Sequence, residues 1–186
     1  MRVTFEISTK DLGHFRDCMQ KALHAVRDAD ESDIVEAARE MFLEVNDAKA
    51  PTFVRDRLRH LEAMVDMIED EIWALPDPAR GRILSALVYF CDPEDMIPDS
   101  IPGIGYLDDA IMIELVFREL RHEIEAYEDF AEYRDNYNRR FRIGRDAATR
   151  VQRLQTRRDK LFERFARRNA KDKIAQAKGK QPAPLW

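Results

Sequence analysis

Five aspartates, Asp92, Asp95, Asp99, Asp108 and Asp109, lie within 18 residues on a stretch rich in proline and glycine. Proline and glycine interrupt helices, so this stretch is expected to fold back on itself. Carboxylates brought within about 5 Å of one another repel unless they are protonated or bridged by Mg²⁺, Mn²⁺ or Ca²⁺. The spacing therefore raises the hypothesis of a divalent-metal site, and of a metal-dependent enzyme centred on it.

The same stretch has a purely structural interpretation, which we favour. Asp92 can cap a short turn opened by Pro93, while Asp99 and Asp108 can cap a second turn and the helix that follows. The spacing also departs from the Asp-x-Asp-x-Asp-Gly pattern of a calcium loop. The residues that would stiffen this turn or anchor it in the core are Pro93, Ile97, Pro98, Ile101, Pro102, Gly105 and Leu107. On this interpretation the protein has no resident cofactor, with metal binding as the alternative.

The whole segment from Cys91 to Asp109 resembles the signature of the YkvA-like family, a bacterial family of unknown function. The matching elements are Asp92-Pro93, Asp95, Ile97-Pro98-Asp99, Ile101-Pro102, Gly105 and Leu107-Asp108-Asp109. With its flanking helices the resemblance covers about residues 83–120, and it implies no established activity. Typical members follow the turn with a more continuously apolar helix, which Glu114, Arg118 and Glu119 interrupt here.

Other constellations that could support catalysis are incomplete. The chain has no Gly-rich phosphate loop and no Gly-x-Ser-x-Gly nucleophile motif. Glu119 and His122 have the spacing of one half of a di-iron site, but no second Glu-x-x-His exists. Cys18 and Cys91 lack the spacing of zinc ligands, and we interpret them as buried thiols. The sequence favours a protein that is not an enzyme.

The composition and the hydrophobic periodicity predict an all-α helical bundle. The chain is 45% hydrophobic and 36% charged, with only 6 Gly and 8 Pro, which favours helices over many short strands. The one alternating segment, Arg2–Ile7, predicts a short strand or extended arm that pairs with a second subunit. The expected helices run from Ser8 or Thr9 to Val26, from Ser32 to Val45, from Pro51 to Leu75, from Pro78 to Cys91, from Asp108 to about Asp135, and from Asp146 to Ala177.

Charge divides the chain into two parts. Residues 1–138 carry a net charge of −17 and residues 139–186 a net charge of +12, within a total of −5. We predict an acidic helical domain over 1–138, able to fold alone, and a basic amphipathic extension over 139–186 with a flexible end from Lys178. The basic helix should contact either the acidic body or an external polyanion. The residues expected to make this contact are Arg150, Arg153, Arg157, Arg158, Arg164, Arg167 and Arg168.

These observations favour a non-catalytic interaction or scaffold module, which we expect to form a homo-oligomer. The alternatives are the metal site described above and a peripheral binder of an anionic membrane or of nucleic acid. No recognition helix that reads bases is apparent, so nucleic acid is less favoured. The chain shows no secretory signal, and no apolar run approaches the roughly 20 residues of a membrane span. We therefore expect a cytoplasmic protein that can lie at the membrane surface.

Overall fold

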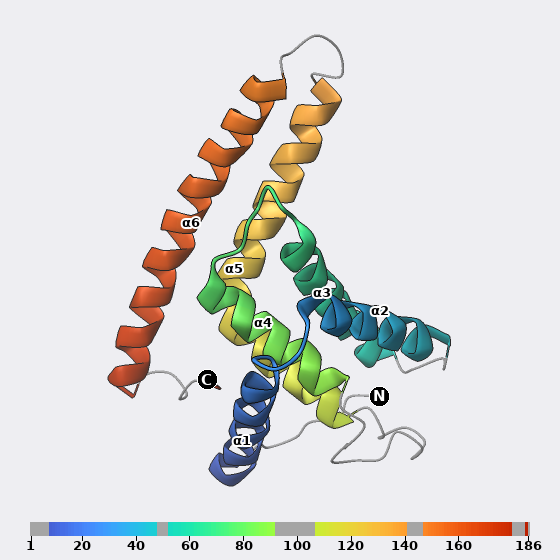
Figure 1. Cartoon of the computed structure of the whole chain (residues 1–186). Helices are drawn as coiled ribbons and strands as arrows, with labels where there is room; N and C mark the ends of the chain where they lie inside the picture. The colour runs from blue at the N-terminus through green and yellow to red at the C-terminus, as the bar shows by residue number, and fades with distance from the viewer. Residues whose placement is uncertain (1–7, 48–51, 92–106, 141–146, 180–184, 186) are drawn as a thin grey trace.

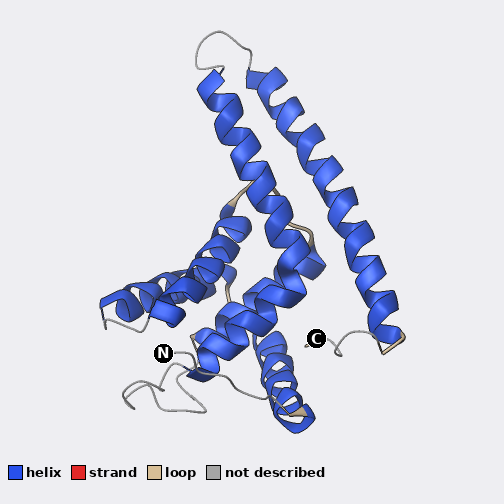
Figure 2. Ribbon diagram, turned by 180° about the vertical axis from the view of Figure 1, so that it is seen from behind, coloured by secondary structure: helices blue, strands red, loops and turns tan. Residues whose placement is uncertain are grey.

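The structure, a computed structural model, describes residues 8–47, 52–91, 107–140, 147–179 and 185 (Figure 1). The described residues form helices and connecting turns without a strand, which confirms the all-α class (Figure 2). The helices are α1 (Thr9–Ala25), α2 (Glu31–Asp47), α3 (Thr52–Glu69), α4 (Asp77–Phe90), α5 (Leu107–Arg140) and α6 (Ala147–Ala177). The predicted arm at Arg2–Ile7, and with it the expected oligomer contact, lies outside the described residues.

Helix α4 lies at the centre of the bundle, as its apolar character on most sides predicts. It packs against α1, α2, α3 and α5. Helix α5 in turn contacts α3 and forms a long antiparallel hairpin with α6. The C-terminal part of α5 and the N-terminal part of α6 extend beyond the α1–α4 bundle (Figures 1 and 2). Buried side chains from all six helices form one continuous hydrophobic cluster. The basic helix therefore shares its core with the acidic part of the chain.

The start of α2 differs from the sequence-based expectation. Asp30, rather than Ser32, occupies the capping position: its Oδ1 accepts the backbone N–H of Ser32 at 3.0 Å and the Ser32 hydroxyl at 2.8 Å. The Ile34 N–H donates to the Asp30 carbonyl, which closes the first helical turn. Both side chains suit an N-cap, and the observed cap lies two residues before Ser32.

The third helix is shorter than its apolar spacing predicted. The spacing continued to Leu75, but α3 ends at Glu69. Asp70 then accepts the backbone N–H groups of Ile72 and Trp73 at 3.1 and 3.0 Å, which holds a tight turn. Ala74 takes up a positive φ of 45°, and the turn directs Trp73 into the core, where it is fully buried.

Two later helix starts are also corrected. Helix α4 has Pro76 at its N-cap without a side-chain cap, so Asp77 is its first residue rather than its cap. Helix α5 begins at Leu107, which places Asp108 in the first turn instead of at the cap. A carboxylate in the first turn still interacts favourably with the helix dipole. An acidic residue therefore indicates that a helix begins nearby, but it does not identify which residue is the N-cap.

The C-terminal end of the chain is not wholly free. Gly179, with φ of 67°, follows α6, and its N–H donates to the Gln176 carbonyl at 2.9 Å. This conformation ends helices and favours glycine. Beyond it, Leu185 is only 3% exposed and belongs to the hydrophobic cluster. The flexible end expected from Lys178 onward therefore has at least one anchored residue.

Candidate functional site

The aspartate-rich turn lies mostly outside the described residues. This applies to Asp92, Asp95 and Asp99, to the side chain of Asp109, and to the turn residues from Pro93 to Gly105. Asp108 is described and is 3% exposed. Within the part of the chain that the structure describes, no three His, Cys, Asp or Glu side chains are arranged to hold a metal ion. Metal binding by the five aspartates therefore remains a hypothesis.

The α5–α6 hairpin is held by ion pairs between its two helices. The basic helix supplies Arg164 and Arg168, which pair with Asp129 and Glu125 of α5. The reverse arrangement occurs further along, where Asp172 of α6 pairs with Arg121 of α5 and is hydrogen-bonded to His122. Each pair is partly exposed, so each contributes at most about 1 kcal/mol. Together they set the register in which α6 lies on α5.

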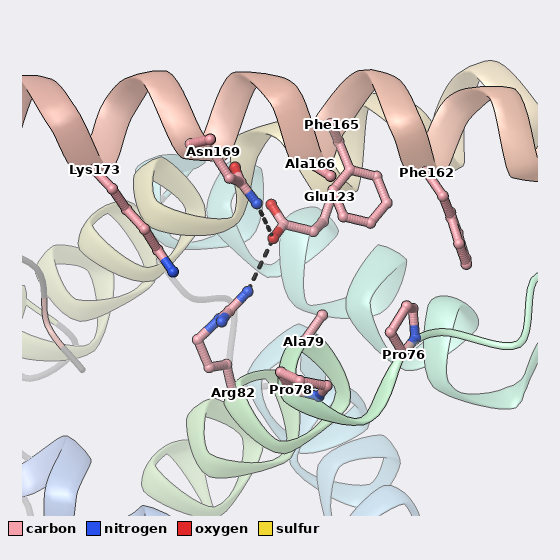
Figure 3. A pocket seen from close by; sticks show the side chains of 11 residues that line it. Pro76, Pro78, Ala79, Arg82, Glu123, Phe162, Phe165, Ala166, Asn169 and Lys173 are labelled. Atoms are coloured by element: carbon pink, nitrogen blue, oxygen red, sulfur yellow. Dashed lines mark hydrogen bonds and ion pairs between the residues drawn. The ribbon is translucent and has the colours of Figure 1, made fainter.

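A buried carboxylate joins three helices beside this interface (Figure 3). Glu123 of α5 has a side chain only 1% exposed. Its Oε1 accepts hydrogen bonds from Arg82 of α4 at 2.9 Å and from Asn169 of α6 at 2.7 Å. These groups line an open groove of about 420 Å³, whose walls include Phe162 and Phe165. Because the Arg82 charge compensates the buried carboxylate, we assign this group a structural role in fixing α6.

The opposite side of α6 has a different character. Five cations recur there at spacings of seven and four residues, which places them on one face of the helix. This outward flank consists of Arg153, Lys160, Arg167, Lys171 and Lys178, and all five are exposed. Among the described residues, none of them forms an ion pair with a carboxylate. The flank therefore presents a row of positive charges that the protein itself does not neutralise.

A shallow hollow of about 460 Å³ lies where the outward flank approaches α5. It is lined by Tyr133 of α5 and by Gln152, Arg153, Thr156, Arg157 and Lys160 of α6. The Arg157 guanidinium stands over the Tyr133 ring, 5.5 Å from its centre. No carboxylate lines the hollow, so its three cations give it a strongly positive character.

The seven arginines predicted as partner contacts fall into two groups. Arg150 bonds Asn138, Arg158 bonds the Ile72 carbonyl, and Arg164 and Arg168 pair with α5 as described above; these four serve contacts within the chain. The remaining three, Arg153, Arg157 and Arg167, lie on the outward flank or in the hollow. The sequence pattern therefore grouped together residues that the structure places on two faces of α6.

Glu123 is absent from the residues predicted from the sequence, although its position carries a signal. Val116, Glu123 and Phe130 are spaced by seven residues, and all three are completely buried. A carboxylate at an interior position of an otherwise apolar heptad pattern indicates a buried partner of opposite charge. The predicted contact set also lacks Lys160, Lys171 and Lys178, although their spacing from Arg153 places them on the same face of the helix.

The sequence of the chain matches proteins that have no assigned activity. A family described as a protein of unknown function, DUF1232, matches residues 79–115, which span most of α4 and the start of α5. The chain is also 30% identical over 77 residues to the uncharacterized membrane protein YkvA of Bacillus subtilis (strain 168), covering 38% of this chain and 71% of that protein. No solved structure matches the chain.

The chain therefore belongs to the YkvA-like family of unknown function, which confirms the resemblance seen in the sequence. The match covers the segment that carries the Asp/Pro-rich turn. Within the described part of the chain, no helix has both the length and the apolar character needed to cross a bilayer.

Proposed function

We propose that the protein is a non-catalytic helical module that associates peripherally with an anionic membrane surface through the outward flank of α6. The observation that carries the proposal is the division of cations on this helix. Four of them are engaged by carboxylates or other acceptors of the chain itself, namely Arg150, Arg158, Arg164 and Arg168. Those on the outward flank are exposed and have no carboxylate partner among the described residues.

Unneutralised cations on a rigid helix attract an extended negative surface. Near an anionic leaflet each Lys or Arg contributes about 1 kcal/mol, and the attraction weakens as salt rises. Five such residues on one face supply several kcal/mol, which suffices for reversible association. Because α6 is anchored to α5 on its other side, the row of charges is already ordered and costs little entropy on binding.

An apolar contribution lies beside the same charges. Ile174 is 56% exposed and sits three to four residues from Lys171 and Lys178, so these side chains are neighbours on the helix surface. A basic face with exposed apolar residues suits the boundary between headgroups and acyl chains. The relative in Bacillus subtilis is named a membrane protein, and this supports a membrane over nucleic acid as the partner.

Vesicle sedimentation tests the proposal with the full chain. Vesicles of phosphatidylcholine with and without phosphatidylglycerol are compared at low and at physiological salt. A flank variant combines Arg153→Gln, Lys160→Gln, Arg167→Gln and Lys171→Gln. Its control makes the same change in net charge at exposed positions elsewhere, with Lys21→Gln, Arg27→Gln, Arg55→Gln and Arg59→Gln.

We expect the wild type and the control to bind the anionic vesicles in a salt-dependent way. The flank variant should bind about 1000-fold more weakly, because four contributions of about 1 kcal/mol are removed and each 1.4 kcal/mol is a factor of ten. If both variants weaken binding equally, net charge rather than the flank is responsible and the proposal fails. Tighter binding to duplex DNA than to anionic vesicles would identify nucleic acid as the partner instead.

A further inference from the structure

We infer that the hollow between α5 and α6 is a binding site for a phosphomonoester headgroup of a membrane lipid. This inference rests on the proposed function and adds a headgroup preference to it. Arg153 and Lys160 belong both to the hollow and to the outward flank, so a lipid held in the hollow lies in the surface that the flank contacts. That continuity favours a membrane lipid over a soluble phosphate as the source of the group.

The charges that line the hollow select for an anion. Arg153, Arg157 and Lys160 approach it from successive turns of α6, and no lining residue is a carboxylate. Tyr133 and Gln152 also line the hollow, and both side chains carry neutral donor groups. The Thr156 hydroxyl already donates to the Gln152 carbonyl at 2.9 Å, which leaves its oxygen as an acceptor for a protonated phosphate oxygen.

Arg157 is the residue on which the site depends. Its guanidinium is half-buried against the Tyr133 ring, and its buried Nε has no acceptor among the described residues. It forms no ion pair with a described carboxylate, unlike Arg164 one heptad further along the same helix. A guanidinium that an aromatic ring positions, and that has no carboxylate partner among the described residues, is well suited to the forked hydrogen bonds that phosphate oxygens accept.

A phosphomonoester fits this arrangement better than a phosphodiester. It carries a charge of about −1.5 to −2 and three strong acceptor oxygens, whereas a diester carries a single charge and two free oxygens. Three cations that line one hollow interact more strongly with the additional charge of a monoester. The other cations of the outward flank interact with the average charge of the membrane surface. The hollow should therefore discriminate between headgroups, and the flank should not.

The experiment compares vesicles containing phosphatidic acid, a monoester, with vesicles containing phosphatidylglycerol, a diester, matched for surface potential. The proteins are the full-length wild type, Arg157→Gln in the hollow, and Arg167→Gln on the flank outside it. Circular dichroism confirms that each variant is folded. Lys160→Gln, on the exposed rim, provides a second hollow variant in case Arg157→Gln loses structure with its Tyr133 contact.

We expect the wild type to bind phosphatidic acid vesicles at least tenfold more tightly than the matched diester vesicles. Arg157→Gln should lose that preference, while its binding to phosphatidylglycerol should weaken by no more than the about fivefold that the loss of one surface cation costs. Arg167→Gln should weaken binding to both lipids by the same factor and keep the preference. Lys160→Gln should reduce the preference as well as the general affinity.

Equal binding of the wild type to the two matched vesicles would overturn the inference, as would an undiminished preference in Arg157→Gln. Calorimetry with glycerol 3-phosphate tests the source of the group. If that soluble monoester binds the wild type and abolishes the vesicle preference at micromolar concentration, the lipid assignment is wrong. If the wild type binds the diester vesicles but shows no preference for the monoester, the inference fails and the proposed function stands. If the wild type binds neither kind of vesicle, the proposed function fails as well.

Discussion

The Asp70 carboxylate accepts the backbone N–H of Trp73 at 3.0 Å, and this bond turns the chain so that the indole enters the core. There Trp73 packs on Tyr127 and Phe130 of α5 and on Phe162 of α6, at ring-centre distances of 5.5, 5.2 and 4.7 Å. One carboxylate thus ends α3 and positions the side chain around which the hairpin packs. The other Asp70 oxygen is paired with Arg134 of α5.

Asp70→Ala should lower the free energy of unfolding by about 2–4 kcal/mol, because it removes a cap and leaves the half-buried Arg134 without its partner. Urea unfolding followed by circular dichroism and tryptophan fluorescence gives the value. Glu62→Ala, at an exposed acidic position of α3, should change stability by less than about 0.5 kcal/mol. Equal effects of the two substitutions would show that the turn does not depend on Asp70.

Glu123→Ala should be among the most destabilising single changes in the hairpin. It leaves Arg82 and Asn169 without their shared acceptor and opens a gap in the core, with an expected cost of about 3 kcal/mol. Glu125→Ala, two residues away, removes an exposed pair with Arg168 and should cost less than about 1 kcal/mol. Chemical denaturation of both variants measures the difference, and a cost for Glu123→Ala no larger than that for Glu125→Ala would contradict the structural role assigned here.

Cys91 should react slowly with alkylating reagents in the folded protein. Burial raises the pKa of the Cys91 thiol from its usual 9.0 to about 11, so its thiolate fraction at pH 8 falls by about 100-fold. In a Cys18→Ser background, iodoacetamide alkylation followed by mass spectrometry should be at least that much slower in buffer than in urea. The rate in buffer should keep rising with pH beyond 10, whereas a plateau near pH 9 would indicate an unperturbed thiol.

Removal of residues 139–186 should disrupt the fold. Charge patterning alone predicts a self-sufficient domain over 1–138, but Leu154, Leu161 and Phe165 are buried in the common core. Burial of each large apolar side chain contributes about 1.5–3 kcal/mol, so their loss is comparable with the 5–15 kcal/mol that stabilises a typical domain. Loss of the near-ultraviolet signal of Trp73, with exposed apolar surface, is the expected outcome; a cooperative thermal transition in the truncated protein would contradict it.

The sequence by itself determined the helices and the family. Apolar residues at helical spacing located α1, α2, α4, α5 and α6 to within a few residues, because that periodicity is a local property of each segment. The Asp/Pro-rich turn identified the family for the same reason. A long motif of unusual residues can be recognised from the sequence of that segment alone. Charge asymmetry likewise singled out α6 as the element in contact with something acidic.

Only the tertiary structure decided what each polar residue does. The apolar spacing runs on past Asp70, and the break there depends on Arg134 from α5 and on room in the core for Trp73. Glu123 is buried because Arg82 and Asn169 arrive from other helices. The arginines of α6 look alike in the sequence, yet some meet carboxylates of α5 and others meet solvent. Helical periodicity records which residues share a face, whereas the partner of that face is set by segments distant in the chain.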